Sequence, residues 1–257
     1  MSPDYSGQVA VITGGAGGIG NALGKALEAA GAQVLLADRA AGDGIVACDV
    51  ANLDEVEALA ELAWQRFGRV DLLINNAGIG GAGGRLWKVD PAAARQIFEV
   101  NFWGVWHGCR AFAPRMGAQE HPSAIYNVAS ENALFCAVPR NAAYIASKHA
   151  VLGMTESLRE DLPEHVHAGT IIPGWVLSGL TSEGGRHVAM PADRYAQTIL
   201  PQLAARERFV VSHAYNVVPM AERTEALEAA FARSAPRYDG DIEHDVRAYI
   251  DRLRGQG

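Results

Sequence analysis

Short apolar runs alternate along this chain with longer segments in which apolar residues recur at helical spacing. The runs fall at residues 9–12, 33–37, 45–48, 71–74, 124–128, 169–172 and 209–211. Most of them are apolar continuously rather than at every second position, which is typical of strands buried on both faces. The sequence therefore predicts a parallel sheet of about seven strands.

The segments between the runs predict helices. Residues 19–30 and 53–67 carry apolar side chains every three or four positions. Asp90 and Pro91 form an N-cap followed by a proline in the first turn, which predicts a long helix from there toward Met116. This alternation of strands and helices is typical of an α/β fold, a Rossmann-type doubly wound sheet with helices on both faces.

One connection between predicted strands is short. Only ten residues separate Asp38 from Asp49, and Gly42 and Gly44 are among them. A helical crossover needs roughly a dozen residues or more. We therefore expect a loop at this point.

The domain organisation is predicted to be simple. The sequence contains no repeat, low-complexity linker or break in composition, so residues 1–257 are interpreted as a single dinucleotide-binding and catalytic domain. Within it, residues 175–195 are a candidate substrate lid, because this segment is rich in glycine and contains Pro191. Residues 219–257 are expected to form a C-terminal helical extension of two helices around residues 236–240.

The first predicted strand runs directly into a glycine-rich turn, residues 13–20. Glycine adopts backbone conformations that other residues avoid, and it lets the main chain approach a phosphate closely. The helix that is expected to begin near Gly18 directs free N–H groups and a positive dipole end toward the same point. The turn therefore predicts a site for a dinucleotide pyrophosphate.

The residue that ends the second strand bears on the choice of dinucleotide. Asp38, eighteen residues past Gly20, can accept hydrogen bonds from the adenosine ribose and would repel the 2′-phosphate of NADP. Arg39 beside it can pair with that phosphate. We expect NAD as the cofactor, with NADP as the alternative. Asp49 can accept a hydrogen bond from the adenine amino group.

A tyrosine and a lysine four residues apart, Tyr144 and Lys148, lie on one face of a predicted helix. A nearby ammonium group favours tyrosinate and lowers the pKa of the phenol. Such a phenol can take a proton from an alcohol as hydride leaves, or return it to a carbonyl. The pair therefore predicts Tyr144 as a general acid/base.

Composition narrows the class of protein. Hydrophobic residues make up 49% of the 257 residues, and the net charge is −7 with no basic block, which argues against a nucleic-acid or membrane partner. The three cysteines are scattered, and the eight histidines show no metal-ligand spacing. We find no secretory signal and no long apolar run. The expectation is a cytoplasmic protein with reduced thiols and no metal site.

Several motifs follow one another along the chain: Thr13-Gly14-x-x-x-Gly18-x-Gly20, Asn75-Asn76-Ala77-Gly78, Val100-Asn101, Asn127-Val128-Ala129-Ser130, Tyr144-x-x-x-Lys148 and Pro173-Gly174-Trp175-Val176-Leu177-Ser178. On these motifs, roughly residues 7–180 resemble the short-chain dehydrogenases/reductases. The chain departs from the common pattern in the short connection after Asp38, in Ala129 where serine is frequent, and in Ser178 where threonine is usual.

The resemblance implies roles for particular residues. Ser130 would hold the substrate oxygen near Tyr144, Lys148 would bind the nicotinamide ribose, and Asn101 would bend its helix and hold a water of a proton path. The implied catalytic residues are Asn101, Ser130, Tyr144 and Lys148. The implied cofactor-binding residues are Thr13, Gly14, Gly17, Gly18, Ile19, Gly20, Asp38, Arg39, Asp49, Val50, Asn76, Ala77, Gly78, Tyr144, Lys148, Pro173, Gly174, Val176 and Ser178. The implied substrate-binding residues are Ser130, Asn132, Phe135, Tyr144 and Trp175.

The sequence thus indicates an NAD-dependent oxidoreductase that interconverts a secondary alcohol and its ketone. The aromatic and apolar character of the predicted pocket favours a hydrophobic substrate, aryl or alicyclic, and the resemblance implies a homodimer or homotetramer. Three alternatives stay open: an NADP-dependent carbonyl reductase, a dinucleotide-sensing protein without turnover, and an epimerase or lyase that uses transient oxidation.

Overall fold

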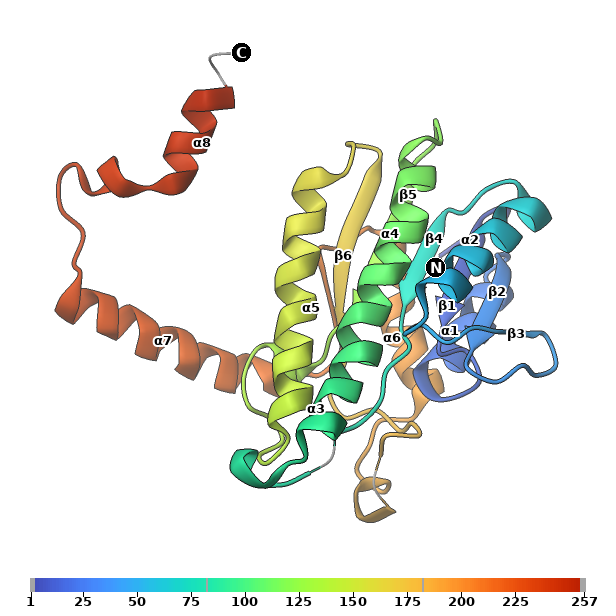
Figure 1. The fold of residues 1–257 in the computed structure, drawn as a ribbon, viewed down its shortest axis with the longest axis horizontal. Helices are drawn as coiled ribbons and strands as arrows, with labels where there is room; N and C mark the ends of the chain where they lie inside the picture. The colour runs from blue at the N-terminus through green and yellow to red at the C-terminus, as the bar shows by residue number, and fades with distance from the viewer. Residues whose placement is uncertain (1–2, 82, 182, 255–257) are drawn as a thin grey trace. The chain divides into compact units, whose positions relative to one another are not determined.

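The computed structural model describes residues 3–81, 83–181 and 183–254. It divides the chain into two compact units, Met1–Ala214 and Tyr215–Gly257. The first unit contains a seven-stranded sheet (Figure 1). Its strands are β1 (Val9–Thr13), β2 (Gln33–Asp38), β3 (Ile45–Ala47), β4 (Leu72–Asn75), β5 (Ser123–Val128), β6 (Val166–Ile172) and β7 (Phe209–Val211). Each coincides with one of the predicted runs, so the strand prediction is confirmed.

All neighbouring strands are parallel, in the order β3-β2-β1-β4-β5-β6-β7. The chain moves outward from β1 in one direction to β3 and then returns to the other side of β1 with β4. Ligands of such sheets bind outside the carboxyl ends of the strands where the order reverses. This topology places the ends of β1 and β4 at the centre of that edge.

Helices cover both faces of the sheet (Figure 1), as predicted. Their bounds are α1 (Gly18–Ala29), α2 (Leu53–Phe67), α3 (Pro91–Phe98), α4 (Gly104–Gly117), α5 (Ala142–Asp161) and α6 (Ala192–Ala204). Residues of α1 and α6 belong to one hydrophobic cluster, and residues of α2, α4 and α5 belong to the other.

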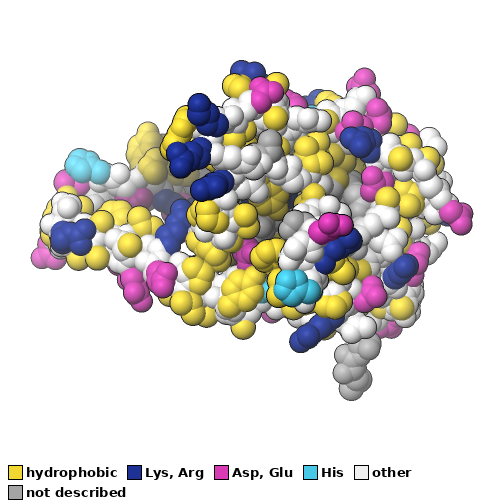
Figure 2. Space-filling view, turned by 90° about the horizontal axis from the view of Figure 1, so that it is seen from below, with side chains coloured by type: hydrophobic (Ala, Val, Ile, Leu, Met, Phe, Trp, Pro, Cys, Tyr) yellow, Lys and Arg dark blue, Asp and Glu magenta, His cyan; other side chains and the backbone are white. Residues whose placement is uncertain are grey.

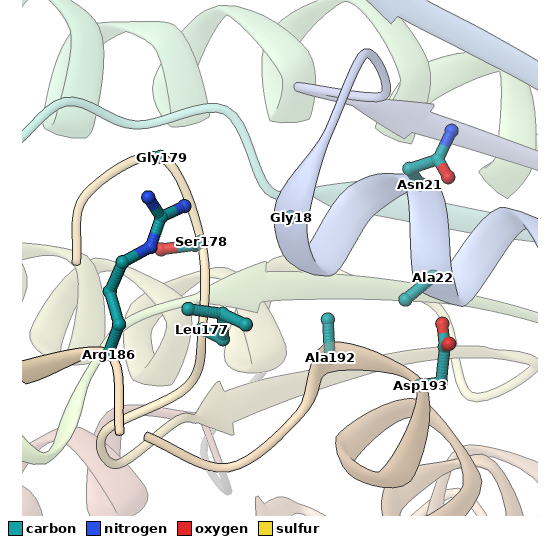
Figure 3. Close-up of a pocket in the computed structure, with 9 residues that line it drawn as sticks. All are labelled: Gly18, Asn21, Ala22, Leu177, Ser178, Gly179, Arg186, Ala192 and Asp193. Carbon is teal, nitrogen blue, oxygen red and sulfur yellow. The ribbon is translucent and has the colours of Figure 1, made fainter. Parts of the chain in front are cut away.

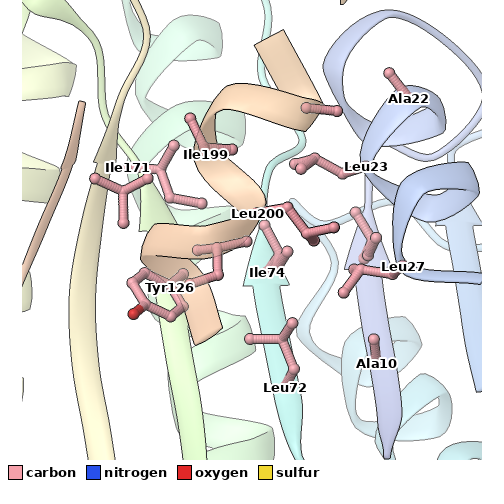
Figure 4. Packing of buried hydrophobic residues seen from close by; sticks show 14 of the residues in the cluster. Ala10, Ala22, Leu23, Leu27, Leu72, Ile74, Tyr126, Ile171, Ile199 and Leu200 are labelled. Carbon is pink, nitrogen blue, oxygen red and sulfur yellow. The ribbon is translucent and has the colours of Figure 1, made fainter. Parts of the chain in front are cut away.

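The apolar runs supply both clusters because alternate residues of each strand point to opposite faces. On one face, Ile74 of β4 packs among side chains of α1 and α6, such as Leu23 and Ile199 (Figure 4). On the other face, Leu73 packs with Val56 of α2 and Phe112 of α4. Burial on both faces is the reason why these strands are continuously apolar.

Two connections differ in how well the sequence predicts them. Between β2 and β3 the chain forms the expected loop, closed by a bridge between Gly42 and Ile45. The helix predicted from Asp90 to Met116 begins as expected, with the Asp90 side chain accepting a hydrogen bond from Ala92 N. It is not one regular helix, however, because a π-helical segment, η2 (Glu99–Trp103), separates α3 from α4.

The second unit contains α7 (Val217–Ser234), a 3-10 turn (Asp241–His244) and α8 (Val246–Arg254). This agrees with the prediction of two helices around residues 236–240. The extension predicted from residue 219 falls within this unit, and its last residues, 255–257, lie outside the described part of the chain.

Charged side chains of both signs are scattered over the face shown in Figure 2, and hydrophobic side chains gather toward its centre. Within residues 3–81, 83–181 and 183–254, no helix combines the length and apolar character that a bilayer-spanning helix requires.

Candidate active site

The turn between β1 and α1 has no room for a Cβ at Gly14, Gly18 or Gly20. Gly14 and Gly18 have φ values of +69° and +53°, which side-chain-bearing residues rarely adopt. A Cβ on Gly14 would lie 2.8 Å from Ala77 Cα, and one on Gly20 would lie 2.2 Å from the carbonyl oxygen of Gly14. Helix α1 begins without a side-chain cap or an acidic residue in its first turn, so its N–H groups suit an anion.

Two polar side chains hold the turn in place. Thr13 Oγ1 accepts hydrogen bonds from the backbone N–H groups of Asn76, at 3.0 Å, and Ala77, at 3.1 Å. Asn76 Nδ2 donates to the carbonyl oxygens of Thr13, at 2.8 Å, and Gly14, at 3.2 Å. The residues that follow β4 therefore brace the turn that follows β1.

Asp38 at the end of β2 is tied to the same turn. Its carboxylate accepts hydrogen bonds from the backbone N–H groups of Ala16, at 2.9 Å, and Arg39, at 2.7 Å. Asp49 accepts one from Ala51 N at 3.0 Å. Both carboxylates are thereby held at one end of a large cavity.

That cavity, of about 750 Å³, extends from Asp38 and Asp49 to Tyr144 and Trp175. Most residues predicted to bind cofactor or substrate line it: Gly14, Gly17, Gly18, Ile19, Asp38, Arg39, Asp49, Val50, Asn76, Ala77, Gly78, Ser130, Asn132, Tyr144, Lys148, Pro173, Gly174, Trp175, Val176 and Ser178. Four predicted residues do not line it: Thr13, Gly20, Asn101 and Phe135. Thr13 and Gly20 shape the turn instead.

The far end of the cavity brings together the predicted catalytic side chains. Ser130 follows β5 and caps a 3-10 turn, η3 (Glu131–Ala133), while Tyr144 and Lys148 are one turn apart on α5. Ser130 and Tyr144 line the same cavity, where the Ser130 side chain acts to lower the Tyr144 pKa. Lys148 Nζ donates to the carbonyl oxygen of Val128 at 2.8 Å and lies 5.9 Å from the Tyr144 ring centroid.

Burial governs the electrostatics of this group. It lowers the pKa of the Lys148 ammonium to about 8. The pKa of Tyr144 is raised, because burial outweighs the opposing hydrogen bond from Ser130, and the negative charge of Glu131 acts in the same direction as burial. The Tyr144 pKa is therefore raised, and not lowered as predicted from the nearby Lys148, because desolvation is the largest effect.

Asn101 lies in the π-helical segment and is fully buried. Its Oδ1 accepts a hydrogen bond from Ile79 N at 2.8 Å, and its Nδ2 donates to Ile79 O at 3.1 Å. Its Nδ2 also donates to Ser147 Oγ at 3.3 Å. The side chain thus connects the irregular helix to the segment after β4 and to α5, behind the cavity.

The predicted substrate-binding residues separate into two groups. Trp175 lines the cavity, with 44% of its surface exposed. Its ring packs closely against Gly185, since a Cβ on that glycine would lie 2.2 Å from Trp175 Cζ2. Phe135, two residues past the 3-10 turn that follows Ser130, does not line the cavity. Asn132 lines the cavity, but its amide is engaged with Ser130 and with the backbone of residues 137–138.

The candidate lid is fastened at its base. Leu177 N donates to Met190 O at 2.8 Å, and Met190 N donates to Trp175 O at 2.8 Å. Residue 182 of this segment lies outside the described residues. A smaller cavity of about 290 Å³ lies between this segment and the starts of α1 and α6, and Figure 3 shows the Arg186 side chain beside Ser178 there.

Sequence reasoning missed several lining residues, among them Gln96, Glu99, Val100, Glu131 and Asn141. Two of them carry a usable signal. Glu131 directly follows Ser130, and Asn141 precedes Tyr144 by one helical turn. The others depend on how α3 approaches the sheet. Within the part of the chain that the structure describes, no three metal-ligating side chains form a group.

Residues 8–188 match the profile of the family described as short chain dehydrogenase. Among curated relatives, a 1-deoxy-11-beta-hydroxypentalenate dehydrogenase of Streptomyces arenae is 39% identical over 203 residues, 69% of this chain and 72% of the relative. A 2,5-dichloro-2,5-cyclohexadiene-1,4-diol dehydrogenase of Sphingobium indicum is 33% identical over 186 residues, 67% of this chain and 74% of the relative.

Solved structures show the same fold. A short chain dehydrogenase/reductase from Burkholderia phymatum in complex with NAD has a TM-score of 0.80 and 31% identity, covering 91% of this chain and 99% of its own. A short chain dehydrogenase from Burkholderia cenocepacia in complex with NADP has a TM-score of 0.75 and 30% identity, covering 91% of this chain and 100% of its own.

Proposed function

The chain belongs to the short-chain dehydrogenases and is an oxidoreductase of alcohol groups. We propose that its cofactor is NAD and that it interconverts hydrophobic secondary alcohols, alicyclic or aryl, and their ketones, with Tyr144 as general acid/base. The observation that carries the proposal is one cavity with a phosphate-compatible glycine turn at one end and Ser130, Tyr144 and Lys148 together at the other.

The residues present fit a nicotinamide dinucleotide. A Cβ on Gly14 or Gly18 would collide with Ala77 or Ser178, whereas Gly17 lines the cavity with no atom within 4 Å of its Cβ position, and helix α1 begins there without a side-chain cap. The nicotinamide, when bound, accepts or supplies the hydride. Lys148 is placed to bind its ribose, and Ser178 lines the cavity where a carboxamide contact is expected.

The protein's own residues manage the proton. Ser130 holds the substrate oxygen by a hydrogen bond, and Tyr144 Oη takes the hydroxyl proton as the carbon loses hydride, or returns it in reduction. Because the Tyr144 pKa is raised by burial, catalysis of alcohol oxidation is expected to increase toward alkaline pH. Asn101 acts as a positioning residue, through its contacts with Ile79 and Ser147.

Asp38 supports NAD over NADP. Its carboxylate is fixed by two backbone N–H groups at the end of β2, where a 2′-phosphate would meet a negative charge. Arg39 also lines the cavity and could pair with a 2′-phosphate. An NADP-dependent carbonyl reductase is therefore the second candidate function.

The substrate class follows from the wall and from the relatives. Trp175, Val176, Leu180 and Val138 give the far end of the cavity an apolar surface. The two relatives described above are named for a hydroxypentalenate and a cyclohexadiene diol. Both features favour cyclic, largely apolar alcohols.

The test is reduction of NAD and, separately, NADP by a panel of alicyclic, aryl and polyol secondary alcohols, with Tyr144→Phe alongside. We expect turnover of cyclic alcohols with NAD, and a loss of about 10³-fold or more in the variant, which keeps its affinity for NAD. A preference for small polyols would contradict the substrate class. Tight NAD binding without turnover on any alcohol would favour a dinucleotide sensor.

A further inference from the structure

Asn132 stands two residues after Ser130 and is 4% exposed. Its backbone N–H donates to Ser130 Oγ at 3.2 Å, and its side-chain Nδ2 donates to the same oxygen at 3.4 Å. Ser130 Oγ therefore receives two donors from one residue.

The number of lone pairs on Ser130 Oγ limits where its proton can be donated. A hydroxyl oxygen has two lone pairs and one proton. With both lone pairs of Ser130 Oγ directed at the N–H groups of Asn132, its proton must be given to another acceptor. Tyr144 lines the same cavity as Ser130, and the Ser130 side chain acts to lower the Tyr144 pKa, so we take the phenolic oxygen as that acceptor in the free protein.

The orientation of the Asn132 amide is itself fixed. Its Oδ1 accepts hydrogen bonds from the backbone N–H groups of Ala137 and Val138, both at 3.1 Å. A rotated amide would present its NH₂ group to these two donors and its oxygen to Ser130. The rotation would lose two hydrogen bonds and provide a competing acceptor for the serine proton, so the network selects one orientation.

We propose that Asn132 is a positioning residue that makes Ser130 an obligatory hydrogen-bond donor, to Tyr144 Oη in the free protein and to the substrate oxygen when a substrate is bound. The chain of donors runs from the backbone of residues 137–138 through the Asn132 amide to the Ser130 hydroxyl. Each bond polarises the next in the same sense. Asn132 was predicted from the sequence to contact the substrate, and this geometry gives it a different task.

The first test needs no substrate. The pKa of Tyr144 is measured by tyrosinate absorbance, as the difference between each protein and its own Tyr144→Phe counterpart. Asn132→Ala removes the amide, and Asn132→Asp keeps its shape but offers an acceptor to the serine proton. Both are expected to raise the pKa of Tyr144, by about 1 for Asn132→Ala and by more for Asn132→Asp. An unchanged pKa in both variants would overturn the inference.

The second test rests on the proposed function and asks whether Asn132 acts through Ser130. Asn132→Ala is expected to lower kcat/KM by about 10- to 100-fold in the wild-type background and by less than about twofold in Ser130→Ala. Equal losses in both backgrounds would mean that Asn132 contacts the substrate directly, and would overturn it.

The two tests separate two failures. If the wild-type protein turned over no alcohol, the proposed function would fail, while the tyrosinate titration would still decide the role of Asn132. Gln65→Glu is the matched control, because it adds the same charge at an exposed position of α2 that does not line the cavity. It is expected to leave the titration and kcat/KM unchanged.

Discussion

At the scale of single residues, Lys148 connects the stability of the protein to pH. Burial lowers its pKa from the ordinary value of 10.5 to about 8. Between these two pH values the unfolded chain binds more protons than the folded one, so the free energy of unfolding rises with pH. The contribution is complete above about pH 10.5 and is lost as the pH falls to about 8, and it amounts to about 3 kcal/mol.

Lys148→Met removes this dependence. We expect the difference in unfolding free energy, wild type minus variant, to increase by about 3 kcal/mol between about pH 7 and pH 11 in urea titrations. Other groups that titrate in this range are common to both proteins and cancel. Lys25→Met, at an exposed position of α1, is the control and should show no such trend. A constant difference for Lys148→Met would mean that the lysine is not desolvated.

A second residue, Asp38, is expected to decide between the two dinucleotides. Asp38→Ser removes the negative charge but keeps an oxygen that can accept from Ala16 N. We expect kcat/KM with NAD to fall by about tenfold and kcat/KM with NADP to rise by about tenfold or more, since Arg39 then faces the 2′-phosphate unopposed.

Asp43→Ser in the same connection is the matched control, because Asp43 is exposed and does not line the cavity. The same change in net charge there should leave both kcat/KM values within about twofold. If the two variants shifted the NAD-to-NADP ratio equally, the effect would belong to the overall charge of the loop rather than to Asp38.

At the scale of elements, the turn between β1 and α1 depends on close backbone contact. Gly20→Ala would place a Cβ 2.2 Å from the Gly14 carbonyl oxygen, so the turn must open. We expect the affinity for NAD to fall by at least about tenfold, and overpacking to destabilise the protein by about 1–3 kcal/mol. Calorimetric titration with NAD and urea unfolding measure the two effects.

Gly153→Ala is the same chemical change but is expected to stabilise the protein instead of destabilising it. Gly153 lies inside α5, and no atom lies within 4 Å of its added Cβ. The change should stabilise the protein by about 0.4–1 kcal/mol and leave NAD affinity unaltered. Equal behaviour of the two alanine variants would show that close packing at Gly20 does not shape the cofactor site.

The elements also show what the sequence can and cannot predict. All seven strands were predicted as short apolar runs between helical segments, and β1, β4 and β5 gave continuous runs because they are buried at every position. The apolar pattern did not predict the π-helical segment around Asn101, because that segment depends on a contact with Ile79 that is distant in the sequence; a bend at Asn101 was expected from the family resemblance alone. Phe135 shows the same limit: adjacency to Ser130 suggested the pocket, but the path of the 3-10 turn decides which residues line it.

In the candidate active site, too, some features were predictable from the sequence and others depend on distant contacts. Motif spacing predicted that Ser130, Tyr144 and Lys148 meet, and the structure places all three in one cavity. Motif spacing could not predict the direction in which the Tyr144 pKa is shifted, because desolvation depends on every neighbour and not on Lys148 alone. The task proposed for Asn132 likewise depends on the backbone of a later loop, residues 137–138.

At the scale of the whole molecule, aromatic side chains gather on the helix that runs from α3 to α4. Trp103 and Trp106 are 41% and 45% exposed. Their ring centroids are 5.8 Å apart, and that of Phe102 lies 5.1 Å from Trp103. Aromatic clusters on an exposed face are typical of protein–protein contacts. We therefore propose a homodimer or homotetramer that buries this face against a second copy.

Trp106→Glu tests this assembly, because a carboxylate at the centre of an apolar contact would lose its hydration without a partner. We expect light scattering to give the wild-type protein a mass two or four times that of the chain, and the variant a smaller mass with unchanged circular dichroism. Trp87→Glu, at a tryptophan that is 73% exposed in a short 3-10 turn, should keep the wild-type mass. An assembly that survives Trp106→Glu would have to be held by another surface, whereas a monomeric wild type would mean that this aromatic face serves some other contact.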